Sequence, residues 1–243
     1  MPTSPPISAP ISETFTSVQG EGKLAGVPSW FVRFSGCNLR CSWCDTPYAS
    51  WSAESKQRDM QGLIDEAARA KAANVSHAVI TGGEPMMFAQ AEDLASALRN
   101  LGMHITIETA GTIFREIACD LMSISPKLSN STPQNTDPRD KDALWQVRHE
   151  ARRINLDALQ KLIDAYPARQ LKFVVSDSQQ LGEIETLLRS LRGWKQDDVL
   201  LMPEGITVDA LAKRHWVVDE CVKRGWRYCA RLHIELFGNV RGT

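Results

Sequence analysis

The chain has 243 residues, of which 43% are hydrophobic, and carries a formal net charge of -1 at pH 7. This length and apolar content suit one α/β domain with a substantial core. The nearly balanced charge gives no electrostatic reason to expect nucleic acid or an anionic membrane as a partner, and no apolar run reaches the roughly 18 residues that a membrane-spanning segment needs.

The six cysteines are too few to form a dense disulfide framework in a chain of this length. Cys119, Cys221 and Cys229 are scattered among apolar residues, where a free thiol behaves as a small buried hydrophobe. Reduced thiols indicate a cytoplasmic protein. The N-terminus has no basic stretch followed by an apolar run, so we expect no signal peptide.

In chain order, residues 1–10 are rich in Pro and Ser and are predicted to be a disordered leader. Residues 11–243 are expected to form a single domain. Aromatic and β-branched content predicts strands at 11–18 (a short edge strand), 30–34, 77–80, 104–108, 121–124, 170–175, 199–202 and 226–230. Apolar residues at helical spacing, together with capping residues, predict helices at 60–73, 90–101, 156–165, 178–191 and from the N-cap Thr207 to Arg224. Two polar segments remain: an exposed connection at 52–58, and an insertion at 128–154 that is a loop or partly helical.

The alternation of strands and helices predicts an α/β fold with a largely parallel sheet, which right-handed crossovers would curl into an open, incomplete β/α barrel. Polar clusters follow directly after five of the predicted strands, at 37–44, 81–85, 108–112, 125–127 and 202–205. In such folds, ligands bind at the carboxyl ends of the strands. We therefore expect these clusters to form one site.

Cys37, Cys41 and Cys44 lie in one short polar loop directly after the predicted strand 30–34. Closely spaced thiolates hold iron–sulfur clusters, and a cubane cluster normally takes four of them. No fourth cysteine lies nearby in the sequence, so one iron would stay free for a ligand that is not protein. Structural zinc, which also wants four ligands, and a disulfide, which would leave one thiol over, are the alternatives.

The spacing Cys-x3-Cys-x2-Cys, with the aromatic Trp43 before the last cysteine, resembles the signature of the radical S-adenosylmethionine (SAM) superfamily. Further motifs make the chain similar to one family within it, the 7-carboxy-7-deazaguanine synthases of queuosine and deazapurine biosynthesis. They occur in patches at 18–22 (Val-Gln-Gly-Glu-Gly), 26–28, 31–33, 36–37, 41–46 (Cys-Ser-Trp-Cys-Asp-Thr), 81–85 (Thr-Gly-Gly-Glu-Pro), 108–112, 125–127 and around His233 in the tail.

The resemblance implies a lyase that uses a [4Fe-4S] cluster on three cysteines, SAM and Mg²⁺. The reduced cluster would cleave SAM to methionine and a 5′-deoxyadenosyl radical, which takes a hydrogen from C6 of 6-carboxy-5,6,7,8-tetrahydropterin. Ring contraction and loss of ammonia would then give 7-carboxy-7-deazaguanine. The resemblance also implies a homodimer, and a flavodoxin or ferredoxin as the electron donor.

Residue roles follow from the same resemblance. The cluster would be held by Cys37, Cys41 and Cys44, and Mg²⁺ by Thr46, because a hard cation prefers oxygen ligands. SAM would be bound by Trp43, Asp45, Gly83, Glu84, Glu108, Ser125, Pro126, Lys127, Met202 and Pro203, with Gly83 and Glu84 at its amino group. The pterin would be bound by Val18, Gln19, Gly20, Glu21, Arg33, Thr81 and His233, with the Arg33 guanidinium paired to its carboxylate. From the sequence alone, Arg33 could equally form a structural ion pair.

Two departures and two rival functions remain open. Met202 stands where many members of the family carry Gln, so this contact to SAM would be made by backbone only. The insertion at 128–154 is longer than we expect for the family. A radical SAM activase that abstracts hydrogen from a glycine of a partner protein would share the cysteine loop. A non-catalytic iron–sulfur electron carrier would not need the Gly-Gly-Glu-Pro motif.

Overall fold

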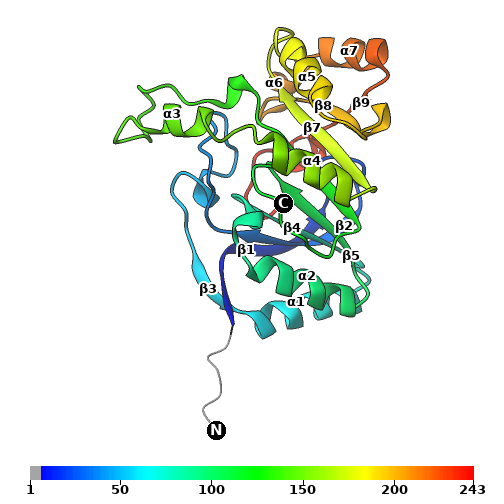
Figure 1. The fold of residues 1–243 in the computed structure, drawn as a ribbon. Coiled ribbons are helices and arrows are strands. Elements are labelled where there is room, and N and C mark those ends of the chain that lie inside the picture. The colour runs from blue at the N-terminus through cyan, green and yellow to red at the C-terminus, as the bar shows by residue number, and fades with distance from the viewer. Residues whose placement is uncertain (1–6) are drawn as a thin grey trace.

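The computed structural model describes residues 7–243, and its strands form one nine-stranded sheet (Figure 1). The order across the sheet is β3-β1-β2-β4-β5-β6-β7-β8-β9. The strands are β1 (Ser8–Val18), β2 (Pro28–Phe34), β3 (Lys56–Asp59), β4 (His77–Gly82), β5 (His104–Thr109), β6 (Leu121–Ile124), β7 (Arg169–Val175), β8 (Val199–Pro203) and β9 (Arg227–Tyr228).

From β2 to β9 all neighbouring strands are parallel, whereas β1 pairs antiparallel with both β2 and β3. The two outer strands of the sheet, β3 and β9, do not pair with each other, so the sheet curves without closing. The predicted incomplete parallel β/α barrel is therefore confirmed.

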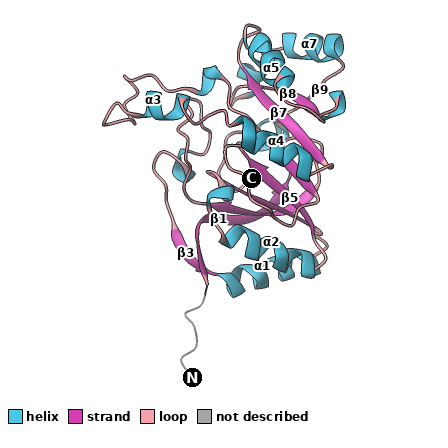
Figure 2. Ribbon diagram, viewed as in Figure 1, coloured by secondary structure: helices cyan, strands magenta, loops and turns pink. Residues whose placement is uncertain are grey.

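The helices are α1 (Met60–Ala72), α2 (Gln90–Asn100), α3 (Trp145–Glu150), α4 (Leu156–Ala165), α5 (Gln180–Arg189), α6 (Val208–Ala212), α7 (Trp216–Arg224) and α8 (Leu232–Phe237). In Figure 2, α1 and α2 lie side by side along one part of the sheet, and α5 and α7 lie beside β8 and β9 at its other end. The main core fills the space between sheet and helices, with Ile80, Ile105 and Phe173 fully buried in it. This packing leaves the inner, concave face of the sheet for a site.

The sequence misjudged the beginning of the chain. Residues 1–6 of the predicted leader lie outside the described residues, but β1 already begins at Ser8, so the leader prediction is wrong for 8–10. Ala9 is fully buried, and the Pro-rich composition concealed its pairing with Arg58. The edge strand is β3, within what was predicted as an exposed connection, and β1 is an inner strand.

Two further differences concern helices. The helix predicted from Thr207 to Arg224 is two helices, α6 and α7, separated at 213–215. Arg214 in this break pairs with Glu204 after β8, at 2.6 Å. The insertion at 128–154 contains a 3₁₀ turn at Ser129–Ser131 and one short α-helix, α3, which projects from the rest of the molecule in Figure 1.

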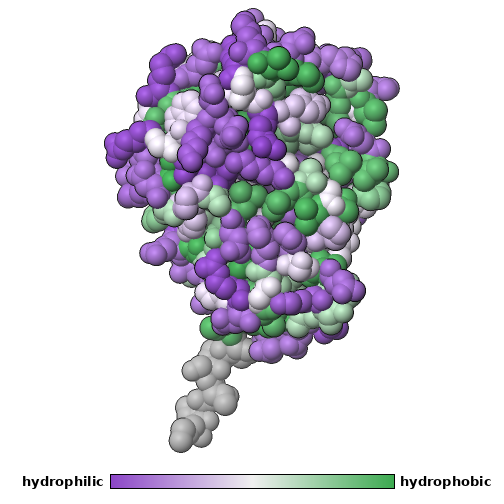
Figure 3. All heavy atoms as spheres, turned by 90° about the vertical axis from the view of Figure 1, so that its right-hand side faces the viewer, coloured by the Kyte–Doolittle hydropathy of each residue, from purple (hydrophilic) through white to green (hydrophobic). Residues whose placement is uncertain are grey.

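The surface is mixed in character. Figure 3 shows hydrophilic and hydrophobic residues interspersed over the face that lies to the right in Figure 1. Within residues 7–243, no helix combines the length and the apolar character needed to cross a lipid bilayer.

Candidate active site

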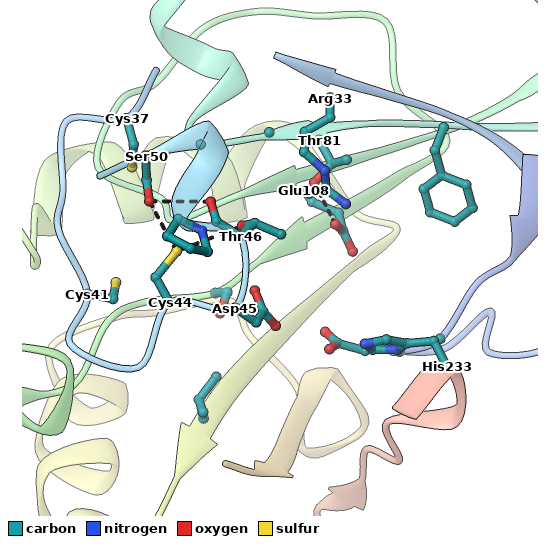
Figure 4. Close-up of a pocket in the computed structure, with 18 of the residues that line it drawn as sticks. Arg33, Cys37, Cys41, Cys44, Asp45, Thr46, Ser50, Thr81, Glu108 and His233 are labelled. Carbon is teal, nitrogen blue, oxygen red and sulfur yellow. Dashed lines mark hydrogen bonds between the residues drawn. The ribbon is translucent and has the colours of Figure 1, made fainter. Parts of the chain in front are cut away.

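A cavity of about 480 Å³ opens at the carboxyl ends of the parallel strands, on the inner face of the sheet. In Figure 4 the cysteine loop lies on one side of this pocket, and Arg33, Glu108 and His233 lie on the other. All predicted site residues line the pocket except Glu84, Pro126 and Pro203. The strand-end clusters of the sequence therefore do meet in one place.

Strand alternation explains which side chains reach the pocket. In β7, Phe173 and Val175 pack in the outer core, whereas Lys172 and Val174 line the pocket. The same alternation on the other strands brings inward Phe31, Arg33, Thr81, Glu108, Ser123 and Met202. So many polar groups facing one interior space would be costly in a packed core, so this face marks a binding cavity.

The three cysteines of the loop follow β2 and all line the pocket as free thiols. Cys41 is buried, and Cys37 and Cys44 are partly buried. Burial raises the pKa of Cys37 to about 12 and raises that of Cys41 as well. Thiolates at Cys37 and Cys41 therefore need a bound cation, and the three thiols of one loop fit an iron–sulfur cluster on three cysteines.

The zinc alternative lacks a suitable ligand set. Within the described part of the chain, no group of three or more His, Cys, Asp or Glu side chains converges closely enough to hold a single metal ion. A structural zinc site needs four ligands around one ion. A cubane cluster differs because each cysteine binds a different iron atom, so the sulfur ligands stand further apart.

Gly82 and Gly83 at the end of β4 let the backbone pack against the start of the cysteine loop. A Cβ atom on Gly83 would lie 2.2 Å from the Gly36 carbonyl oxygen, and one on Gly82 would lie 2.3 Å from that of Phe34. The amide of Gly83 donates to Phe34 at 3.0 Å, and that of Glu84 to Gly36 at 2.9 Å. The Gly-Gly pair thus fixes where the cysteine loop leaves the sheet.

Hydroxyl and charged groups surround the part of the pocket that was predicted to bind SAM. Thr81 donates to Glu108 at 2.8 Å, and Lys127 donates to the Ser125 hydroxyl at 2.8 Å. The Lys127 ammonium also lies 5.8 Å from the centre of the Trp43 ring. Lys127 and the Ser125 hydroxyl offer one cation and one hydroxyl to an anionic ligand, whereas the Thr81 hydroxyl is taken up by Glu108.

Trp43 packs against a small apolar cluster on the inner face that contains Val174, Leu200 and Met202. Its indole nitrogen is buried without a hydrogen-bond partner among the described residues. Met202 is itself buried and lines the pocket, so its side chain contributes an apolar wall.

The prediction that the Glu84 side chain contacts SAM is wrong. Its carboxylate is fully buried behind the pocket and accepts hydrogen bonds from the Thr109 hydroxyl at 2.8 Å and the amides of Met86 at 3.0 Å and Ala110 at 2.7 Å. Burial raises the pKa of Glu84 despite these donors. Glu84 therefore joins the end of β4 to the end of β5. Pro126 and Pro203 also lie outside the pocket lining; Pro203 follows the inward-facing Met202 in β8, so strand alternation turns it to the outer face of the sheet.

Glu21 lies in a buried ion network on the predicted pterin side. One carboxylate oxygen pairs with Lys172 and the other with Arg231 at 3.0 Å, and Arg231 also pairs with Asp45. Burial opposes ionisation, but the two cations outweigh it and hold the pKa of Glu21 well below its usual range. The carboxylate is thus ionised and fixed in position.

Gln19 and Val18 reach the same side of the pocket from the end of β1. The amide nitrogen of buried Gln19 donates to the Ser29 hydroxyl at 3.1 Å. His233, near the start of α8, faces this segment, and burial lowers the pKa of its imidazole. The imidazole is therefore neutral near pH 7, able to donate one hydrogen bond and accept another.

Arg33 forms the structural ion pair that the sequence left open. Its Nε donates to Glu13 of the neighbouring strand at 2.7 Å, and Glu13 also accepts from the Tyr48 hydroxyl at 2.9 Å. Arg33 nevertheless lines the pocket, and neither of its terminal nitrogens bonds to another described residue. A guanidinium held at Nε can still receive an anion on its outer edge.

Thr46 and Asp45 end the cysteine loop. The Thr46 hydroxyl lies 3.8 Å from the Cys44 sulfur, and the Ser50 hydroxyl lies 3.2 Å from the same atom. Both hydroxyls line the pocket, so oxygen ligands for a hard cation are present beside the loop.

Sequence reasoning missed Lys172, Arg231, Ser50 and the tail residues 239–243 as parts of the site. Lys172 carried a signal, because a charged residue inside a strongly apolar strand must face a partner. Arg231 carried none, since its charged partners Glu21 and Asp45 come from the opposite end of the chain.

Comparison with known proteins gives a consistent result. The model of the radical SAM superfamily matches residues 31–191. The chain is 46% identical to the 7-carboxy-7-deazaguanine synthase of Rhodopirellula baltica, over 96% of this chain and 88% of that one. It is also 46% identical to that of Halobacterium salinarum, over 96% and 92%. The crystal structure of QueE from Escherichia coli superposes with a TM-score of 0.66 at 26% identity, covering 93% of this chain and 95% of that one.

Proposed function

Because the chain belongs to the radical SAM superfamily and, within it, to the 7-carboxy-7-deazaguanine synthases, we propose that its pocket is divided into a cofactor half and a substrate half. The enzyme converts 6-carboxy-5,6,7,8-tetrahydropterin to 7-carboxy-7-deazaguanine with loss of ammonia, a step of queuosine biosynthesis. Its cofactors are a [4Fe-4S] cluster and SAM, which together supply the 5′-deoxyadenosyl radical that removes the substrate's C6 hydrogen.

In the cofactor half, Cys37, Cys41 and Cys44 hold the cluster. Lys127 and the Ser125 hydroxyl bind the carboxylate of SAM, and Trp43 packs on its purine. What supports this assignment is the position of the Lys127 ammonium, which donates to the Ser125 hydroxyl and lies 5.8 Å from the centre of the Trp43 ring. The backbone of Gly83, and not the side chain of Glu84, faces the amino group of SAM.

In the substrate half, the outer edge of Arg33 binds the pterin carboxylate, and Glu21 accepts hydrogen bonds from the donor edge of the ring. Gln19 and His233 supply further polar contacts. Lys172 and Arg231 keep Glu21 ionised and rigid, which matters because a hydrogen-bond acceptor acts best when it is already oriented. These residues position the C6–H bond of the substrate and exclude water, while the cofactors supply the radical.

The single observation that carries the function is that one cavity is lined both by the three cysteines and by Gln19, Glu21 and Arg33. The test is an anaerobic assay of the reconstituted enzyme with SAM, dithionite, Mg²⁺ and the tetrahydropterin, with products read by mass spectrometry. Formation of 7-carboxy-7-deazaguanine is expected. Accumulation of 5′-deoxyadenosine with the pterin untouched would keep the superfamily and overturn the substrate.

Mg²⁺ binds at Thr46 in this proposal. The cation would take the Thr46 hydroxyl, waters and substrate oxygens, as Mg²⁺ prefers few protein ligands. What supports it is a hydroxyl on the pocket wall next to Asp45.

A flavodoxin or ferredoxin supplies electrons to the cluster, and the enzyme works in the cytoplasm, where the six free cysteines of the described chain stay reduced.

The enzyme acts as a homodimer, which exposed apolar side chains such as Leu236 and Phe237 support. Light scattering of the reconstituted enzyme tests the dimer, and a mass of one chain would overturn it.

A further inference from the structure

His149 connects the insertion to the cysteine loop. It lies on α3, is fully buried, and its Nδ1 accepts a hydrogen bond from the backbone amide of Arg40 at 3.1 Å. Arg40 stands between Cys37 and Cys41, so this bond fixes a peptide unit inside the loop. An acceptor from a sequence-distant segment thus satisfies a backbone donor that no strand or helix could pair.

The other ring nitrogen of His149 sets which form the imidazole takes. Nε2 lies 2.9 Å from the Ser131 hydroxyl, and this hydroxyl donates to the Leu128 carbonyl at 2.6 Å. Because the hydroxyl proton is committed to Leu128, Ser131 must accept from Nε2–H, which leaves Nδ1 as the acceptor for Arg40. Burial lowers the pKa of His149 to about 4, so the ring stays neutral.

The same segment holds the loop at other points. The amide of Ser42 donates to the Ser131 carbonyl at 2.8 Å, and Arg139 donates to the Ser42 carbonyl at 2.7 Å. On the outer side, the Arg40 guanidinium stacks over Trp145 of α3 at 4.3 Å. The insertion is therefore an outer wall of the loop, and His149 is its fully buried polar contact with the segment between two cysteines.

We propose that His149 is a positioning residue of the cluster site: through Nδ1 it fixes the Arg40 peptide, and with it the relative placement of Cys37 and Cys41. The inference rests on the proposed assignment of the cluster to the three cysteines. Holding the Arg40 amide on the imidazole also keeps this donor away from sulfur. Since hydrogen bonds to sulfur help to set the potential of a cluster, His149 also contributes to its redox properties.

The decisive experiment uses the full chain without cluster, so that it does not depend on activity. Hydrogen exchange of the Arg40 amide is followed by NMR, with the Ile80 amide in the core as a reference for global unfolding. In His149→Phe, which keeps an aromatic ring but has no nitrogen acceptor, Arg40 should exchange about tenfold faster or more relative to Ile80. In His149→Asn, whose Oδ1 replaces Nδ1, exchange should stay near that of the wild type. His104→Phe, a histidine change distant from the loop, should leave it unchanged.

Two further measurements keep the inference testable if His149→Phe does not fold. Nitrogen-15 NMR of the wild type should show the neutral Nε2–H form of His149, and finding the Nδ1–H form would overturn the proposal. After reconstitution, His149→Asn should retain iron and a reduction potential close to the wild type, whereas Ser131→Ala should shift the potential to a more positive value. Equal Arg40 exchange in His149→Phe and wild type would also overturn it. Failure of the cluster assignment itself would appear separately, as cluster retention after replacement of a loop cysteine.

Discussion

The imidazole of His233 lies directly on the backbone of Gly20, so that a Cβ atom added to Gly20 would be 2.0 Å from Nδ1 of His233. The amide of the preceding residue, Leu232, donates to the Gly20 carbonyl at 2.8 Å. The glycine in the Gln-Gly-Glu motif is therefore required by a side chain from the far end of the chain. The backbone of Gly20 and the imidazole of His233 therefore form one corner of the pocket together.

Replacing Gly20 by Ala should displace this imidazole. We expect the free energy of unfolding to fall by about 1–3 kcal/mol, the usual cost of overpacking, and kcat/KM to fall about tenfold or more because His233 leaves its place. Urea unfolding of the protein without cluster and steady-state assays measure the two effects. Adding His233→Ala should restore much of the lost stability, and strictly additive losses in the double variant would show that the two residues do not compete for space.

Replacing Cys37, Cys41 or Cys44 by Ala should abolish cluster and turnover together, since each thiolate holds one iron. Iron analysis, the visible absorbance of the cluster and product formation provide the readouts. Cys119→Ala is the matched control, because Cys119 does not line the pocket, and it should keep both. Retained iron and activity in any loop variant would refute the assignment.

Arg33→Gln should raise KM for the pterin by about 10–100-fold, as expected for loss of a hydrogen bond to a charged group. Arg33 has two roles in this proposal: it binds the pterin carboxylate, and it forms an ion pair with Glu13. Variants of the residues around Glu13 separate these two roles. Glu13 also pairs with Arg241 at 2.9 Å, so Arg241→Gln perturbs the same carboxylate without touching Arg33. If Arg33 only stabilised Glu13, Arg33→Gln and Glu13→Gln would have equal effects on KM and on stability.

Thr46→Ala should weaken the dependence of the rate on Mg²⁺ and leave the cluster intact, because it removes one oxygen beside Cys44 but no sulfur. Thr46→Ser keeps that oxygen and should retain the wild-type response. The measurement is a Mg²⁺ titration of the initial rate, with iron content as the control. An unchanged response in Thr46→Ala removes Thr46 from the metal site.

Glu21 should make the protein sensitive to acid. Its ordinary pKa is 4.5, and in the folded state Lys172 and Arg231 outweigh the effect of burial and hold it far lower. As pH falls below the ordinary value, the unfolded carboxyl takes up a proton while the folded one stays ionised, so the free energy of unfolding decreases. In Glu21→Gln, the free energy of unfolding should fall less steeply with decreasing pH. The difference in slope is at most about 1.4 kcal/mol per pH unit. Urea unfolding between about pH 5 and pH 3 tests it, and equal slopes would contradict it.

Local sequence signals predicted the parallel part of the fold well, for physical reasons. Buried strands such as 121–124 and the amphipathic helix at 156–165 were predicted with the bounds that the structure has. β3 was missed because Lys56–Asp59 is polar and largely exposed, and pairs with β1 at the edge of the sheet. Its hydrogen bonds come from a partner strand that no local pattern reveals.

The site was predictable where a motif ends a strand and not where it depends on distant contacts. The three cysteines line the pocket, as do Gly83 after β4 and Ser125 and Lys127 after β6, whereas Glu84 and Pro126 do not. Glu84 was misplaced because its spacing after Gly83 does not show that Thr109 and Ala110 take up its carboxylate. The pairing of Glu21 with Arg231 across the chain likewise left no mark in the sequence.

The contacts between β1 and the tail have a consequence for how the protein is made. Arg241 hydrogen-bonds to Glu13 across 228 positions, whereas His149 meets Arg40 across 109. During synthesis, the cysteine loop and its outer wall can therefore assemble before Arg241 has been made. The wall of the pocket beside β1 closes only after Arg241 can reach Glu13. In chain order, residues 239–243 are thus the last part of the pocket lining to be added, beside cysteines that precede them by about 200 positions.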